Sequence, residues 1–166
     1  FGKKCAFIDL GRPDDVATLD GLIRSADIFA HSWRPGSLDR RGLSPAAMAA
    51  KRPGIIYVSI SCYGYDGPWA ERAGYDPHGQ VASGYAAGEG TVDQPLLAPT
   101  FWLNDYLAAY LAAAGVGSAL LKRAAVGGSY HVKVSLTGAS MFTQELGELP
   151  RHLWPDGSNG VTSLPL

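Results

Sequence analysis

The feature that most constrains the fold is the almost unbroken apolar and β-branched run Ile-Ile-Tyr-Val-Ser-Ile-Ser at residues 55–61. Such a run is typical of a strand buried on both faces, as in a parallel sheet. A shorter apolar run lies at residues 27–31, and residues 44–52 between them begin with Ser44 and Pro45, which favour a helix start. This order of strand, helix and strand predicts an α/β fold with a Rossmann-like parallel sheet and flanking helices.

The remaining segments continue the alternation of strands and helices. We expect further strands at residues 4–10 and 130–136, and further helices at residues 13–25, 76–87 and 137–149. Residues 62–74 are dense in Gly, Pro and aromatic residues and are predicted to form a loop, as is the glycine-containing connection at residues 88–99. The sequence therefore predicts one α/β domain over residues 1–149 and an irregular tail over residues 150–166.

A long alanine-rich helix is predicted at residues 103–123. No charged residue occurs from Tyr106 to Leu121, and the larger apolar residues recur on one stripe. We therefore expect this helix to be buried nearly all round, either in the core or at a subunit interface. Its small residues would allow close packing against a neighbouring element.

Composition excludes several classes of function. The 166-residue chain is 46% hydrophobic, 17% charged and has a net charge of −1, which argues against nucleic-acid binding. The longest uncharged helical segment is too short and too rich in small residues to span a bilayer, so we expect no membrane partner. Neither the two cysteines nor the four histidines show metal-ligand spacing, so no metal site is expected.

The start of the chain bears on its location in the cell. The opening residues Phe-Gly-Lys-Lys are not followed by the apolar stretch of a secretory leader, and cysteine usage indicates a reducing compartment. We expect a cytoplasmic protein. The chain lacks an initial Met, which is consistent with a fragment of a longer protein.

The first candidate site is the turn Ser32-Trp-Arg-Pro-Gly36, which directly follows the predicted strand at residues 27–31. Ligands of open α/β sheets bind beyond the carboxyl ends of the strands. There, Trp33 could stack on a purine while Arg34 and Arg40 pair with phosphates. The alternative is an ordinary surface turn with solvated arginines.

The second candidate is Asp105, at the start of the long helix. The positive helix end would keep its carboxylate ionised, and neighbouring aromatic residues would exclude water, which makes it a usable nucleophile. The alternative is that Asn104 and Asp105 are capping residues. No P-loop or nucleophile-elbow sequence is present, and His131 in the last predicted strand favours a structural role.

Four motifs, in order, resemble the class III CoA-transferases, which include formyl-CoA and carnitine CoA-transferases and the related α-methylacyl-CoA racemase. They are Phe7-Ile-Asp-Leu-Gly11, Ser32-Trp-Arg-Pro-Gly36, Ser59-Ile-Ser-Cys-Tyr-Gly-Tyr-Asp-Gly-Pro68 with Gly74-Tyr-Asp76, and Asp105 followed by Gly128-Ser-Tyr-His-Val-Lys-Val-Ser-Leu136. The match extends over most of residues 5–136. It implies an incomplete version of the family's large domain.

The resemblance implies an activity and its substrates. Asp105 would attack the thioester of an acyl-CoA, giving an acyl anhydride, then an aspartyl-CoA thioester, before CoA passes to a carboxylic acid. The positions implied to line the coenzyme A site are Ile8, Asp9, Leu10, Gly11, Ser32, Trp33, Arg34, Arg40, Arg72, Ala73, Gly74 and Tyr75. The implied partners are acyl-CoA, a carboxylic acid, and a second copy of the chain or a complementary chain.

The chain also departs from the family pattern. Ser32 replaces an Asn, Gly11 stands where a Lys is common, and Tyr75 stands where the racemases carry a His, which argues against racemisation. Family members also begin with another βα unit and continue into a second domain. The alternative function is therefore a catalytically inert half that binds CoA or acts as a scaffold.

Overall fold

The computed structural model describes residues 2–100, 102–147 and 150 of the chain. In that part of the chain three strands form one parallel sheet, in the order β1 (Ile28–His31), β2 (Ile56–Ser61) and β3 (Tyr130–Ser135). The helices are α1 (Pro13–Ser25), α2 (Pro45–Lys51), α3 (Asp76–Ala82), α4 (Tyr85–Glu89), α5 (Leu103–Val126) and α6 (Leu136–Glu145), with the 3-10 turn η1 (Asp39–Arg41). The predicted fold class is confirmed.

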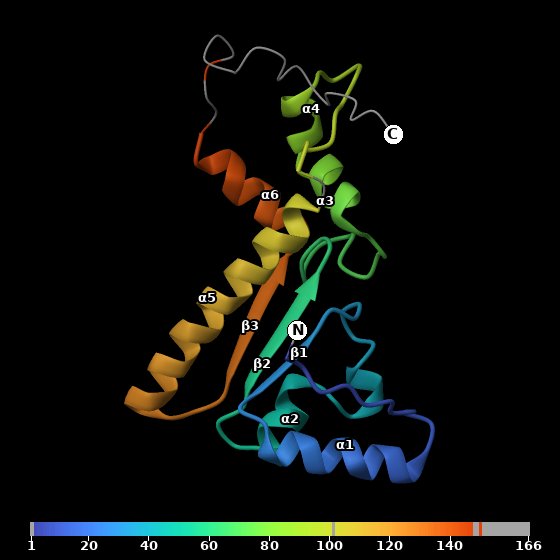
Figure 1. The fold of residues 1–166 in the computed structure, drawn as a ribbon, viewed down its shortest axis with the longest axis vertical. Helices are drawn as coiled ribbons and strands as arrows, with labels where there is room; N and C mark the ends of the chain where they lie inside the picture. The colour runs from blue at the N-terminus through green and yellow to red at the C-terminus, as the bar shows by residue number, and fades with distance from the viewer. Residues whose placement is uncertain (1, 101, 148–149, 151–166) are drawn as a thin grey trace.

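The sheet lies between two helical layers (Figure 1). On one face, Ile55 and Tyr57 pack with Ile23 of α1 and Met48 of α2. On the other face, β2 and β3 pack against α5. The helices α3, α4 and α6 gather beyond the carboxyl ends of β2 and β3 (Figure 1). This arrangement leaves the carboxyl edge of the sheet as the place where loops from different parts of the chain meet.

The predicted starts of α1 and α2 are confirmed. Pro13 opens α1, followed by Asp14 and Asp15 at the positive helix end. The Ser44 hydroxyl accepts a hydrogen bond from the Ala47 amide at 3.2 Å, so it caps α2 as expected. The strand β2 is buried on both faces.

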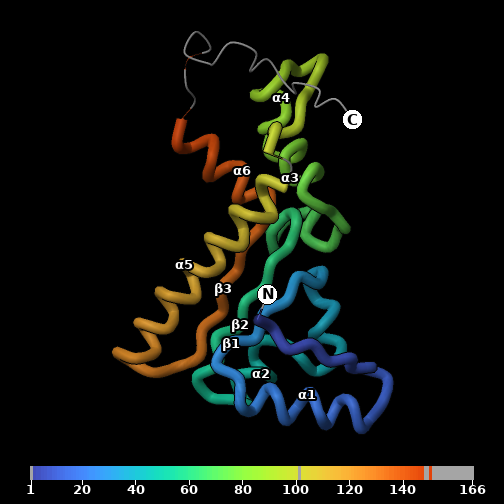
Figure 2. The backbone as a smooth tube through the Cα atoms, viewed as in Figure 1, coloured from blue at the N-terminus to red at the C-terminus, as the bar shows by residue number. Residues whose placement is uncertain are grey.

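The strand predicted at residues 4–10 is absent from the described structure, where this segment runs as an extended chain without regular structure (Figure 2). A strand needs a neighbour to bond its backbone, and β1 pairs only with β2. Phe7 is 91% exposed, which fits a segment without a partner. The backbone instead turns at Asp9, whose carboxylate accepts from the Gly11 amide at 2.8 Å.

Within this chain the long helix is not buried nearly all round, so the alternative that places all of it in the core is wrong. Tyr110 is 72% exposed and Leu121 is 75% exposed, because they project away from the sheet. Most of the fully buried positions are alanines, among them Ala108 and Ala112, while larger residues such as Val116 and Leu120 are partly buried against the sheet. A Cβ atom on Gly115 would lie 2.6 Å from Val132 Cγ1, so small residues bring α5 close to the sheet.

Two other helices differ from prediction in their extent. The helix predicted at residues 76–87 is divided at Gly84, whose φ of 81° is readily adopted only by glycine, and α4 extends into the predicted connection. The last helix, α6, ends at Glu145. Of the tail predicted over residues 150–166, all but residue 150 lies outside the described residues.

Candidate functional site

Asp105 lies in the first turn of α5 and is solvent-exposed. The helix begins after Trp102, whose φ of 54° makes it the only non-glycine residue with positive φ among the described residues. A left-handed tryptophan is an uncommon conformation that costs about 1–3 kcal/mol and must be held by its surroundings. The helix start at Asp105 is therefore a locally constrained part of the backbone.

The helix start is capped by Asp76, a residue from α3. Its Oδ2 atom accepts from the backbone amides of Asn104 at 2.6 Å and Asp105 at 3.2 Å. First-turn amides have no partner within their own helix, so an acceptor from outside satisfies them. Sequence reasoning left open whether Asn104 and Asp105 are the caps. In the part of the chain that the structure describes, Asp76 has that role.

The carboxyl group of Asp105 is more basic than an ordinary aspartate. Partial burial raises its pKa, and the neighbouring Asp76 carboxylate raises it further. This direction is opposite to the effect that a helix end alone would produce. A more basic carboxylate is a stronger nucleophile.

Of the predicted coenzyme A positions, the segment Arg72 to Tyr75 is connected to Asp105 through Asp76, which accepts from the Asp105 amide. It leads directly into Asp76, and the Cys62 thiol, which follows β2, donates a weak bond to the Tyr75 carbonyl at 3.7 Å. Gly74 is required there, because a Cβ atom would lie within 2.4 Å of Cys62 Sγ. Arg72 lies over the Trp69 ring, 5.2 Å from its centroid. Arg72 and Trp69 also line a pocket of about 500 Å³ beside α3.

The other predicted positions follow β1 or precede α1. Ser32, Trp33 and Arg34 lie just past the carboxyl end of β1, and Arg40 lies in η1; all four are exposed. The Ile8 to Gly11 segment is attached to α1, because Asp15 accepts from the Asp9 amide at 2.9 Å. These groups do not share a pocket with the Arg72 segment, because Arg34 lines one pocket and Arg72 another.

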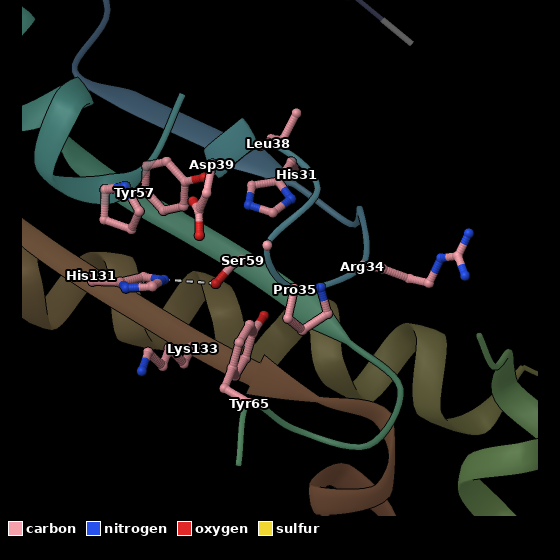
Figure 3. Close-up of a pocket in the computed structure, with 12 residues that line it drawn as sticks. His31, Arg34, Pro35, Leu38, Asp39, Tyr57, Ser59, Tyr65, His131 and Lys133 are labelled. Atoms are coloured by element: carbon pink, nitrogen blue, oxygen red, sulfur yellow. Dashed lines mark hydrogen bonds between the residues drawn. The ribbon is translucent and has the colours of Figure 1, made fainter. Parts of the chain in front are cut away.

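The pocket that contains Arg34 lies against the sheet and has a volume of about 330 Å³ (Figure 3). It is built from the loop after β1 and from side chains of all three strands. Ser59 Oγ and His131 Nε2 are hydrogen-bonded there at 2.7 Å, although the two residues are 72 positions apart. The lining residues are His31, Arg34, Pro35, Gly36, Leu38, Asp39, Pro45, Tyr57, Ser59, Tyr65, His131 and Lys133. Sequence reasoning missed this pocket.

A hydrogen bond determines the tautomer of His31 in the pocket. The Trp33 amide donates to His31 Nδ1 at 3.1 Å, so the neutral ring carries its proton on Nε2. Burial lowers the pKa of His31, while Asp39 opposes this shift. Burial, followed by the charges of Lys133 and His31, lowers the pKa of His131. Both rings therefore favour the neutral form.

The pocket histidines predict a pH dependence of stability. Because their pKa is lower in the folded protein than the ordinary value of about 6.5, the unfolded chain binds more protons just below that pH. We expect the free energy of unfolding to fall as pH decreases from about 7.5 to 5.5. Urea unfolding at both pH values measures it. His131→Gln should reduce the fall; an undiminished fall in this variant contradicts the assignment.

Within residues 2–100, 102–147 and 150, no group of three His, Cys, Asp or Glu side chains is placed to hold a metal ion. In the same part of the chain, no helix combines the length and apolar character needed to cross a bilayer.

Comparison with known proteins finds CoA-transferases among the proteins that are similar to this chain. The chain is 37% identical over 150 residues to an acyl-CoA transferase of Gibberella moniliformis, covering 86% of this chain and 26% of that protein. It is 32% identical over 136 residues to the succinyl-CoA–L-malate CoA-transferase alpha subunit of Chloroflexus aurantiacus, covering 81% of this chain and 32% of that one. The solved structure of Rv3272 from Mycobacterium tuberculosis superposes with a TM-score of 0.80 at 29% identity, covering 87% of this chain and 41% of that chain.

The chain therefore spans between about a quarter and two-fifths of the length of these relatives. The model of one family, described as CoA-transferase family III, matches residues 1–158. That match covers nearly all of the sequence, and the fold is shared with a solved relative. The chain belongs to the CoA-transferase family III.

Proposed function

We propose that this chain is the part of a CoA-transferase that carries the nucleophile, Asp105, and holds coenzyme A. The observation that carries the proposal is that the Asp105 carboxylate is exposed and does not cap its own helix. The amides at the start of α5 donate to Asp76, so the exposed Asp105 carboxylate is not needed for capping. Its raised pKa adds to its nucleophilicity.

In the proposed reaction Asp105 attacks the thioester carbonyl of an acyl-CoA. The carbon–sulfur bond breaks, CoA leaves as a thiolate, and a mixed anhydride remains on Asp105. The thiolate then attacks the aspartyl carbonyl, which releases the first carboxylic acid and leaves an aspartyl-CoA thioester. An acceptor carboxylate repeats the two steps in reverse order, forming a new acyl-CoA and restoring Asp105.

Coenzyme A itself would lie along the carboxyl edge of the sheet. Arg34 and Lys133 bring two positive charges to the pocket on the sheet, whereas Asp39 brings one negative charge. Phosphate groups suit such donors. The half-exposed Trp33 offers a stacking surface for adenine, and Arg40 is a further cation on the same loop. The pantetheine arm would then run along the Arg72 to Tyr75 segment toward Asp105.

A matched pair of lysines tests the phosphate assignment. Lys133 lies over the Tyr65 ring and Lys122 over the Tyr130 ring, each with Nζ 5.4 Å from the centroid. Only Lys133 lines the pocket. We expect Lys133→Met to weaken CoA binding by about fivefold to tenfold in a calorimetric titration, the loss of one charge-assisted contact. Lys122→Met should leave binding unchanged; equal losses in both variants contradict the assignment.

The alternative is an inert half that binds CoA or supports a partner. One of the known relatives is named as an alpha subunit, which favours a chain that acts with a partner. An exchange assay with labelled CoA, an acyl-CoA and a carboxylic acid distinguishes the transferase from the inert half. Exchange of label that requires Asp105 supports the transferase; CoA binding without exchange overturns it.

We further propose that the chain works in the cytoplasm, as a homodimer or with a complementary chain.

A further inference from the structure

Asp76 is a buried carboxylate that takes no chemical part in the proposed reaction. It is 1% exposed, and burying a charged group is costly unless hydrogen bonds compensate it. Three donors reach it: the Asn104 and Asp105 amides on Oδ2, and the Gln80 side-chain amide on Oδ1. These three hydrogen bonds compensate the cost of burying the Asp76 carboxylate.

The bonds of Asp76 belong to a larger buried network. The Gln80 Oε1 atom accepts from the Ala98 amide at 2.7 Å. The Asn104 side chain donates to the Asp76 carbonyl at 3.3 Å and accepts from the Ser140 hydroxyl at 2.7 Å. The network therefore connects α3, the segment before α5, α5 itself and α6 at one point. Gln80, Asn104 and Ser140 are each buried, so the network is shielded from water.

The network explains why Asp105 is free. A helix start normally takes its acceptor from the N-cap residue, but here that residue is Trp102, which has no oxygen in its side chain. Without an outside acceptor, Asp105 would be the nearest carboxylate able to turn back onto its own first-turn amides. Asp76, 28 positions before Asn104, supplies that acceptor instead.

We propose that Asp76 is a positioning residue for Asp105: by capping α5 from α3, it fixes the helix start and leaves the Asp105 carboxylate free to meet a ligand. This inference rests on the proposed function, in which Asp105 is the nucleophile. Asp76 touches neither substrate nor the reacting atoms. It acts only through the backbone and the charge that it presents to Asp105.

The charge of Asp76 supports the same conclusion. Besides the partial burial of Asp105, the Asp76 carboxylate on α3 raises the Asp105 pKa. The Cys62 thiol after β2 also interacts with Asp105, and both carboxylates act with burial to raise the pKa of that thiol. The thiol is uncharged at neutral pH, so of these two neighbours Asp76 is the one that presents a charge to Asp105.

The experiment compares Asp76→Asn and Asp76→Ala with Ser44→Ala, which removes an ordinary cap on α2. The Asp105 carboxyl carbon is titrated by NMR in each chain, and acylation of Asp105 from an acyl-CoA is followed by mass spectrometry. Asp76→Asn should lower the Asp105 pKa, because the neighbouring charge is gone. Asp76→Ala should lower it too, as Asp105 turns to cap the helix, and should slow acylation roughly tenfold or more. Ser44→Ala should change neither quantity.

An Asp105 titration that is unchanged in Asp76→Asn overturns the inference. If Asp76→Ala does not fold, as judged by circular dichroism, the milder Asp76→Asn variant decides alone. The titration needs no turnover. A shifted Asp105 titration with no acylation even in the unmodified chain would therefore disprove the nucleophile but leave the positioning contact intact. If Asp105 is acylated at the same rate in both Asp76 variants as in the unmodified chain, the positioning role is disproved and the nucleophile assignment stands.

Discussion

Replacing Asp105 by asparagine is expected to lower the rate of CoA transfer by a factor of about 1000 or more, because no other group would form the covalent intermediate. Asparagine keeps the size of the side chain but offers a neutral amide, which is a poor nucleophile. The measurement is exchange of labelled CoA between an acyl-CoA and a free carboxylic acid.

The structure provides two controls for this variant. Asp14 is also a carboxylate in the first turn of a helix, α1, so Asp14→Asn should leave the rate unchanged. The second control is stability. Because Asp105 lies beside the buried Asp76 carboxylate, removing its charge should leave the free energy of unfolding equal or higher. A rate that survives in Asp105→Asn contradicts the nucleophile assignment.

The largest expected effect on stability is that of Met48→Ala. Met48 is 0% exposed and belongs to a buried hydrophobic cluster that joins α1, α2, the loop after β1 and β2, and that also includes Ile23, Leu43 and Tyr57. Removing a buried side chain of this size costs its transfer free energy and leaves a cavity, together about 2–5 kcal/mol. Urea unfolding measures the loss.

The chain has a second methionine that serves as a control. Met141 on α6 is 49% exposed, so Met141→Ala should change the free energy of unfolding by less than about 0.5 kcal/mol. Met48 also supports the side of the sheet on which Tyr57 lines the pocket. A loss no larger for Met48→Ala than for Met141→Ala would contradict the packing described between α2 and the sheet.

Local signals in the sequence were sufficient for several elements. Pro13 with two aspartates marks the start of α1, and Ser44 with Pro45 marks that of α2, because capping acts over three or four residues. The apolar run of β2 identified a parallel sheet because burial on both faces leaves a continuous pattern. The same logic failed at residues 4–10, where a strand-like pattern has no neighbouring strand among the described residues.

The surroundings of an element are harder to predict than its type. The uncharged stretch of α5 predicted burial on all sides, yet its large residues Tyr106 and Tyr110 are exposed and its small ones face the sheet. Hydrophobicity favours burial of large side chains, but close packing against a sheet favours small ones. The sequence does not show which requirement is met on which face.

The candidate site was only partly predictable for a related reason. Asp105 was identified from its place at a helix start, a local property. Its cap, Asp76, comes from another helix, and the pair formed by Ser59 and His131 joins two neighbouring strands. Contacts between residues so distant in sequence depend on the register of β2 and β3 and on the docking of α3. No single-sequence pattern specifies them.

Trapping the intermediate tests the central claim most directly. The chain is incubated with an acyl-CoA and quenched with hydroxylamine, which converts an activated carboxyl group to a hydroxamate, and its peptides are sequenced by mass spectrometry. We predict a hydroxamate on Asp105 that requires acyl-CoA and is absent from Asp105→Asn. Modification of a different carboxylate, or no modification of any residue, would contradict the account.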